Sequence, residues 1–208
     1  TAREGIVISR MVWDALLYRD PATNEYLPNL ATSYNWVDSK TLEFDLRKGV
    51  TFHNGEKFDA DDVVYTLTYI SNPENGAKPA RNVNWWDSAE KLGDYKVRLN
   101  LTKEFPAALE FLSGPIVMYP NEYYAEVGPE GMAMKPVGTG PYAVTSVEPG
   151  KRYKFKKNDN YHASSPKGQA NIGNIVIRTI AESNTQLAEL FSGGVDWIWN
   201  CLLYTSPS

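Results

Sequence analysis

The two histidines of this chain are candidates for catalysis or metal binding, because imidazole transfers protons and binds metals at neutral pH. His53 and His162 are far apart in the sequence, and each stands beside a polar turn. This placement favours two surface imidazoles over a shared metal site. The single cysteine, Cys201, provides neither a multi-cysteine metal site nor an internal disulfide. We therefore expect no bound metal and no cofactor.

Three carboxylates form a second candidate group, since Asp59, Asp61 and Asp62 are near neighbours in the sequence. Glycosidases use two carboxyl groups that face each other across a cleft. Acids spaced this closely instead suit the start of one helix, where the first caps free N–H groups and the others meet the positive end of the helix dipole. We interpret the cluster as architectural.

A third pattern, at residues 138–143, matches the G-x-G-x-x-A fingerprint that binds dinucleotides. That fingerprint requires a helix to begin there, so that pyrophosphate meets the helix N-terminus. Here Pro141 and a β-prone Tyr-Ala-Val-Thr run follow the second glycine, so we interpret the match as accidental. The sequence contains neither a phosphate loop ending in Lys-Ser or Lys-Thr nor a Gly-x-Ser-x-Gly elbow. We do not expect an enzyme.

Composition narrows the remaining classes of function. The net charge is −4 with both signs scattered, which argues against binding of nucleic acid. No apolar stretch is long enough to span a bilayer, and no signal peptide is visible. Aromatic residues make up 12% of the chain, a share that suits either a cradle for an organic ligand or an aromatic-rich core. The long segment 72–87, which contains Trp85-Trp86, is expected to be a loop that is either functional or disordered.

Hydrophobic periodicity predicts the elements that must position these residues. Residues 40–47 alternate as a half-buried strand does, and Asn54-Gly55 is expected to close a hairpin because both residues tolerate positive φ. A helix is expected from Asp59 to Asn72-Pro73, where proline ends it. The other expected elements are strands at 95–101, 116–119, 143–147, 152–156, 174–180 and 195–199 and helices at 105–112, 122–127 and 183–191. Residues 10–18 are expected to form a short helix or a turn that enters a strand. Helices mixed with antiparallel hairpins predict a mixed α/β (α+β) fold.

A set of short segments, spread over the chain up to Asn200, carries a family resemblance. The segments are 30–36, 42–55, 58–65, 94–98, 136–142, 157–161 and 187–196. Each is modest alone, but the ordered set at matching spacing resembles family 5 of the bacterial extracellular solute-binding proteins, which includes dipeptide, oligopeptide and nickel binders.

The resemblance implies a periplasmic binding protein-like fold, in which two lobes close on a ligand. Because family members are much longer, the chain is expected to be a truncated first lobe with its inserted subdomain. Residues 1–14 would be part of that lobe, 15–140 the inserted subdomain, and 141–200 the rest of the lobe, incomplete. Residues 201–208 break the pattern and are expected to be a non-native tail. Such a fragment is expected to expose strand edges and apolar surface, and to be poorly soluble.

The resemblance also places the first-lobe ligand contacts in two segments. One lies just before residues 13–17 and the other in the loop after the capped helix. The implied ligand-binding residues are Ala2, Arg3, Glu4, Arg81, Asn82, Trp85 and Trp86. Arg3 would pair with a ligand carboxylate, and Trp85 or Trp86 would stack in the pocket. A surface arginine and two core tryptophans are the alternatives that the sequence leaves open.

The function implied is that of the periplasmic substrate-binding component of an ABC importer. Such a protein captures di- or oligopeptides by hinge closure and delivers them to an ABC permease in the inner membrane, and it is expected to be a monomer when complete. A nickel chelate or an oligosaccharide is the alternative ligand, and a glycan-active enzyme is the alternative class. The charged residues that grip a peptide's termini in relatives fall largely in the second lobe, so the resemblance implies no particular ligand.

Overall fold

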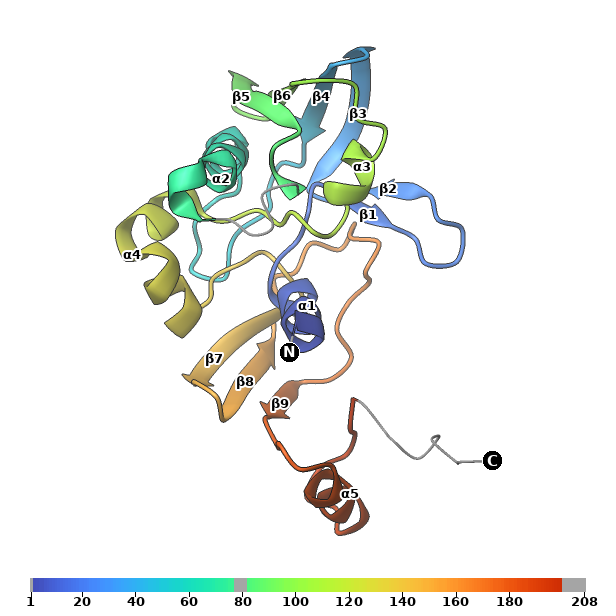
Figure 1. Cartoon of the computed structure of the whole chain (residues 1–208), viewed down its shortest axis with the longest axis vertical. Coiled ribbons are helices and arrows are strands. Elements are labelled where there is room, and N and C mark those ends of the chain that lie inside the picture. The colour runs from blue at the N-terminus through green and yellow to red at the C-terminus, as the bar shows by residue number, and fades with distance from the viewer. Residues whose placement is uncertain (1, 77–81, 200–208) are drawn as a thin grey trace.

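The computed structural model describes residues 2–76 and 82–199, with only the backbone for residues 2–4. Figure 1 shows the arrangement of its elements, which are coloured along the chain. In order they are α1 (Ala2–Val12), β1 (Leu17–Arg19), β2 (Tyr26–Pro28), β3 (Ala31–Asp38), β4 (Thr41–Leu46), α2 (Ala60–Ser71), η1 (Pro73–Asn75), β5 (Trp86–Gly93), β6 (Lys96–Leu101), α3 (Ala108–Phe111), α4 (Asn121–Met134), β7 (Tyr142–Glu148), β8 (Arg152–Lys157), β9 (Asn174–Arg178) and α5 (Ser183–Phe191).

A four-stranded antiparallel sheet in the order β3-β4-β6-β5 organises the larger part of the molecule (Figure 1). The alternation expected for residues 40–47 is confirmed, because Leu42, Phe44 and Leu46 are buried along β4. β6 repeats the pattern, as expected for residues 95–101. Helix α2 packs against β5 and β6, and α4 packs against α2. The core therefore lies between this sheet and its helices.

Helix α2 begins as its acidic start predicts. The Asp59 side chain accepts a hydrogen bond from the Asp61 amide at 2.8 Å, and the Asp62 carboxylate accepts one from the Asp59 amide at 2.9 Å. This reciprocal arrangement is a capping box, which satisfies N–H groups that a helix start leaves free. The helix ends at Ser71, directly before Asn72-Pro73, as expected. The architectural interpretation of the three acids is confirmed.

Three of the expected β elements differ from the observed structure. The hairpin at Asn54-Gly55 is reduced to one bridge between Thr51 and Lys57, and only Gly55 adopts positive φ. Segment 116–119 is buried but forms no strand, because its Met118 amide donates to the carbonyl of Asp14 instead of to a sheet. The strand expected at 195–199 is also not formed.

Three helices have bounds that differ from the expected ones. The helix or turn expected to enter a strand at 10–18 corresponds to the end of α1, which begins earlier, at Ala2, and stops at Val12 before β1 starts at Leu17. Helix α3 is only one turn long. The helical turn expected at 122–127 continues to Met134 across a kink at Gly128, which has φ 65° and precedes Pro129. Glycine tolerates this left-handed conformation, so the chain can restart the helix at the proline.

A smaller antiparallel sheet, β7-β8-β9, follows in the chain and lies apart from the first in Figure 1. Its β7–β8 hairpin turns at Pro149-Gly150, as expected, with Gly150 at φ 71°. Helix α1 packs against β7. Helix α5 matches its expected range and buries none of its residues. Within the described part of the chain, the helices are too short or too polar to cross a membrane.

Candidate functional site

The feature that joins the two sheets is a buried carboxylate directly after α1. Asp14 has no exposed surface. Its Oδ1 lies 2.7 Å from the Lys167 ammonium and accepts hydrogen bonds from Asn29 at 3.3 Å and from the Tyr161 hydroxyl at 3.2 Å. Its Oδ2 accepts from the Thr139 hydroxyl at 3.1 Å. We call this set the Asp14 network.

The Asp14 network draws together segments that are distant in the sequence. Asn29 comes from the chain before β3, Thr139 from the turn before β7, and Tyr161 and Lys167 from the segment after β8. Ser165 closes the set, since its hydroxyl lies 2.6 Å from that of Tyr161 and donates to Asn29 at 3.2 Å. Because a buried charge is costly unless it is paired and hydrogen-bonded, this network specifies how the parts fit.

Lys167 also ties the network to the end of α1. Its ammonium donates to the carbonyl of Arg10 at 2.8 Å and to that of Trp13 at 3.0 Å. The last carbonyls of a helix have no partner within the helix and carry partial negative charge, so a cation is favourable there. One lysine thus neutralises Asp14 and satisfies the helix end.

The glycines of residues 138–143 have a packing role in this joint. A Cβ at Gly138 would lie 2.1 Å from the Val12 carbonyl oxygen, and one at Gly140 would lie 2.5 Å from that of Met11. The turn also bonds to α1's end, since the Gly140 amide donates to the Val12 carbonyl at 2.8 Å. Strand β7 follows directly, where a dinucleotide site would need a helix. The interpretation of the fingerprint as accidental is therefore confirmed.

The expectation of two surface imidazoles is wrong. His53 is half-buried, with Nε2 2.9 Å from the Gly140 carbonyl, and Nδ1 accepts from the Gly138 amide at 3.3 Å. The side chain of His162 is only 8% exposed, and its Nε2 lies 3.9 Å from Asp14. Burial lowers the pKa of both histidines. The polar turns beside them fold inward onto the joint, which local sequence does not reveal.

The chemistry available at Asp14 is structural. Lys167, Asn29, Tyr161 and Thr139 already occupy both carboxylate oxygens. Burial, with the neighbouring carboxylate, raises the pKa of the Tyr161 phenol, so that group remains a protonated donor. Among the described residues, no three His, Cys, Asp or Glu side chains are placed to hold a metal ion. The network fixes the joint between segments, and Asp14 itself has no exposed surface.

The residues expected to contact ligand fall in two places. Ala2, Arg3 and Glu4 form the first turn of α1, and their side chains lie outside the described part of the structure. Arg81 lies outside the described residues altogether. Asn82 is half-buried, and its carbonyl accepts a hydrogen bond from the Trp85 indole at 2.9 Å.

Both tryptophans of the expected pocket lie in the hydrophobic core. Trp85 is 1% exposed and stacks on Phe105 at 4.8 Å between ring centroids. Trp86 is 3% exposed and meets Trp85 edge to face. Of the alternatives left open by the sequence, the described structure matches core tryptophans. That they contact ligand stays a prediction.

Sequence reasoning missed the Asp14 network, although one signal was present. Asp14 is the only acid in the otherwise mostly apolar stretch 10–18. An acid within an apolar stretch marks a buried charge that needs partners. Its partners could not be read from the sequence, because Tyr161 and Lys167 are on the order of 150 residues away.

Comparisons with known proteins define the class. The profile described as "Bacterial extracellular solute-binding proteins, family 5 Middle" matches residues 25–207. The chain therefore belongs to this family. It is 27% identical to a probable ABC transporter-binding protein of Deinococcus radiodurans, over 88% of this chain and 34% of the relative. The chain thus spans about a third of the length of that relative.

Solved structures agree with this assignment. NikZ from Campylobacter jejuni, in complex with Ni(L-His), superposes with a TM-score of 0.79 at 28% identity, over 89% of this chain and 37% of that one. A dipeptide-binding protein from Pseudoalteromonas sp. SM9913, in complex with Met-Leu, superposes with a TM-score of 0.80 at 25% identity. The superposition covers 94% of this chain and 42% of that one. The fold is periplasmic binding protein-like, and the chain corresponds to part of such a structure.

Proposed function

We propose that this chain is part of the periplasmic substrate-binding component of an ABC importer that captures di- or oligopeptides. The observation that carries the proposal is the superposition of 94% of the chain on a dipeptide-binding protein in complex with Met-Leu. Ligand contacts on two lobes would favour the closed state, which a permease in the inner membrane would then recognise. No covalent chemistry is required, and the complete protein would act as a monomer and not as an enzyme.

The geometry supports a rigid half of such a clamp. Hinge closure moves lobes as bodies, so each lobe must keep its own parts fixed. The Asp14 network does this here, because it bonds the end of α1 to the turn before β7 and to the segment between β8 and β9. We propose the division 1–14 and 141–200 for the lobe and 15–140 for the inserted subdomain, with the joint at Asp14 between them.

The ligand contacts belong to the same proposal. Arg3, at the start of α1, would pair with a peptide carboxylate, and Ala2 and Glu4 would line the pocket beside it. Arg81, Asn82, Trp85 and Trp86 would contribute from the other segment. Because both indoles are interior in the described structure, we expect their contribution to be the support of the pocket wall rather than open stacking.

A nickel chelate is the second candidate ligand, favoured by the similarity to the protein in complex with Ni(L-His). Peptide and chelate differ in what the pocket must supply. A peptide needs charged partners for its termini, whereas a histidine-chelated metal arrives with its own ligands and needs few protein donors.

Calorimetry on the protein at the full length of its relatives tests the proposal. Met-Leu, tetra-alanine and nickel with two equivalents of histidine should be titrated separately, with small-angle scattering to record closure. Saturable heat and a smaller radius of gyration with a peptide are expected. If the nickel chelate binds and neither peptide does, the proposed ligand changes from a peptide to a nickel chelate. Turnover of any ligand, or the absence of closure, would reject the transport function.

A further inference from the structure

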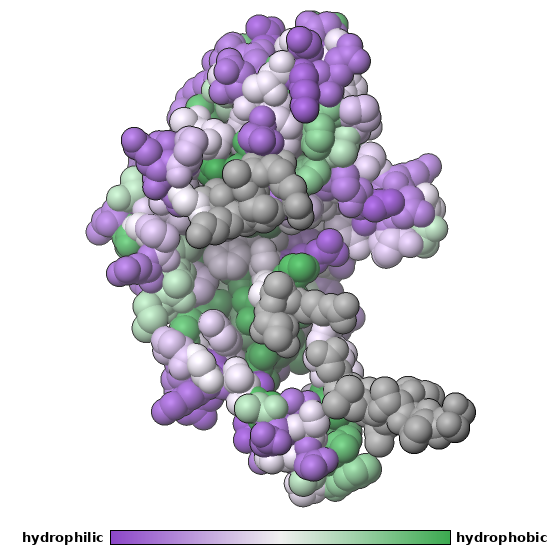
Figure 2. Space-filling model, in the orientation of Figure 1, coloured by the Kyte–Doolittle hydropathy of each residue, from purple (hydrophilic) through white to green (hydrophobic). Residues whose placement is uncertain are grey.

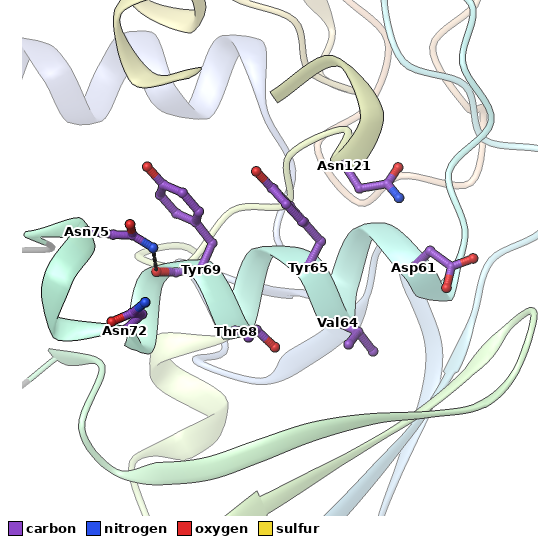
Figure 3. A pocket seen from close by; sticks show the side chains of 8 residues that line it. All are labelled: Asp61, Val64, Tyr65, Thr68, Tyr69, Asn72, Asn75 and Asn121. Atoms are coloured by element: carbon purple, nitrogen blue, oxygen red, sulfur yellow. Dashed lines mark hydrogen bonds between the residues drawn. The ribbon is translucent and has the colours of Figure 1, made fainter. Parts of the chain in front are cut away.

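A cavity lies away from the Asp14 network, on the outer side of α2. It is an open groove of about 470 Å³, within the range of small-molecule sites. Figure 3 shows its lining side chains, which come from α2, the residue after it, η1 and the start of α4. They are Asp61, Val64, Tyr65, Thr68, Tyr69, Asn72, Asn75 and Asn121.

Two tyrosines shape one wall of the groove. Tyr65 and Tyr69 stand one helical turn apart on α2, project to the same side and are nearly parallel, with centroids 5.8 Å apart (Figure 3). Buried Tyr124 from α4 meets both rings edge to face, at 6.1 Å and 5.0 Å, and so holds their orientation. Both rings remain only half-buried. The groove therefore presents preset aromatic surface, which costs little ordering when a ligand binds.

Amide groups complete the lining. Asn121 lies beside Tyr65 because its backbone amide donates to Asp62 of α2 at 2.9 Å, which joins the starts of α2 and α4. Within the described chain, the hydrogen bonds of Asn121 involve this backbone group, so its side-chain amide is available to a ligand as donor and acceptor. Asn72 and Asn75 lie exposed at the other end of the groove.

The electrostatics of the groove select an uncharged ligand. Asp61 is its one ionisable carboxylate, and Lys91 pairs with it at 2.8 Å. Burial raises the pKa of Tyr65, so the phenol stays a neutral donor. Neither a free cation for an anionic ligand nor a continuous apolar surface for a lipid is present among the lining residues. What the groove offers is aromatic faces, hydroxyls and amides.

We propose that this groove is a binding site for a neutral oligosaccharide. The C–H faces of sugar rings pack on aromatic side chains, and their hydroxyl edges bond to phenol and amide groups. Tyr65 and Tyr69 supply the aromatic surface. The side-chain amide of Asn121 and the side-chain oxygen of Asn75, whose Nδ2 donates to the Tyr69 carbonyl at 2.9 Å, supply polar partners. None of the lining residues is among those predicted to contact the transported ligand, and the proposal does not depend on the proposed import of peptides.

Titration of the chain with cellotetraose, maltotetraose and chitotetraose, followed by calorimetry, tests the proposal. At least one sugar should bind saturably at millimolar concentration or below. Tyr65→Phe removes one hydroxyl and Asn121→Ala one amide, and each should weaken binding about twofold to tenfold. Tyr34→Phe is the matched control, because Tyr34 lies exposed on β3 outside the groove, and it should leave affinity unchanged.

Thermal unfolding of each variant separates lost binding from lost folding, and Tyr65→Phe keeps the ring that packs on Tyr69 and Tyr124. The proposal is overturned if no sugar saturates the wild-type chain, or if both groove variants bind as the wild type does. Tetra-alanine binding that falls in Tyr65→Phe while no sugar binds would also overturn it, and would assign the groove to peptides. Peptide capture between lobes in the longer protein would be unaffected by any of these outcomes.

Discussion

The two sheets of this chain share antiparallel pairing and differ in what covers them. In β4 and β6 every second residue is buried, and α2 packs against β6 and the neighbouring strand β5. In β9 the alternation is just as regular, but its inward residues are only half-buried and Val176 is 54% exposed. Alternation of residues along a strand thus predicts that one face of the strand is apolar. That face becomes part of a core only when another layer of helices or strands packs on it.

Helix α5 extends the contrast. Phe191 is 79% exposed and Trp197, shortly after the helix, is 68% exposed. Figure 2 shows green, hydrophobic surface at the lower end of the molecule, where Figure 1 places α5. The exposed apolar surface expected of a partial lobe is therefore present. Poor solubility of the chain stays a prediction.

The largest expected effect tests this difference directly. Phe44→Ala, in β4, should lower the free energy of unfolding by about 3–5 kcal/mol, because it leaves a cavity in the larger core. Phe191→Ala should change it by no more than about 0.5 kcal/mol. Urea unfolding of the two variants measures both values. Equal losses would show that α5 is packed in solution.

The next effect concerns the joint between the regions. Asp14→Asn should cost about 3 kcal/mol, since the Lys167 ammonium is then left without its carboxylate in a mostly buried place. A double-mutant cycle with Lys167→Met should show positive coupling between the two sites. Glu148→Gln, which breaks the exposed pair with Arg152, is the control and should have little effect. Additive losses would mean that the buried pair does not hold the joint.

A smaller effect is expected at the start of α2. Asp59→Ala should cost about 1 kcal/mol, because the Asp61 amide loses its acceptor. Asp59→Asn retains a side-chain oxygen at that place and should recover most of the loss. Chemical denaturation compares the variants, and an equal loss in both would attribute the effect to charge at the helix start.

The smallest expected effect is a pH dependence of the joint. Burial lowers the pKa of His162 below the ordinary value of 6.5. The negative charge of Asp14 raises this pKa, and the positive charges of Arg47 and Lys167 lower it further. The unfolded chain then takes up the proton first, so the stability that His162 contributes is complete above pH 6.5 and is lost as pH falls. Unfolding between pH 8 and 5 should show a steeper acid loss in the wild type than in His162→Gln. Parallel curves would place His162 in solvent.

Part of this molecule could be read from the sequence. The capping box at Asp59, the alternation of β4 and β6 and the Pro149-Gly150 hairpin are local patterns, so a few adjacent residues determine each of them. The candidate site was less accessible. Asp14 was visible as an acid in an apolar stretch, while the burial of His53 and His162 left no local trace.

By itself, the sequence determined where α2 begins and ends, which faces of β4 and β6 are apolar, and through its ordered motifs the family. Only the tertiary structure decided which apolar faces are covered, that Lys167 reaches Asp14, and that Trp85 and Trp86 enter the core. The physical reason is that helix caps and strand alternation depend on neighbours in the chain. Burial of a charge or an indole depends on segments that approach only after folding.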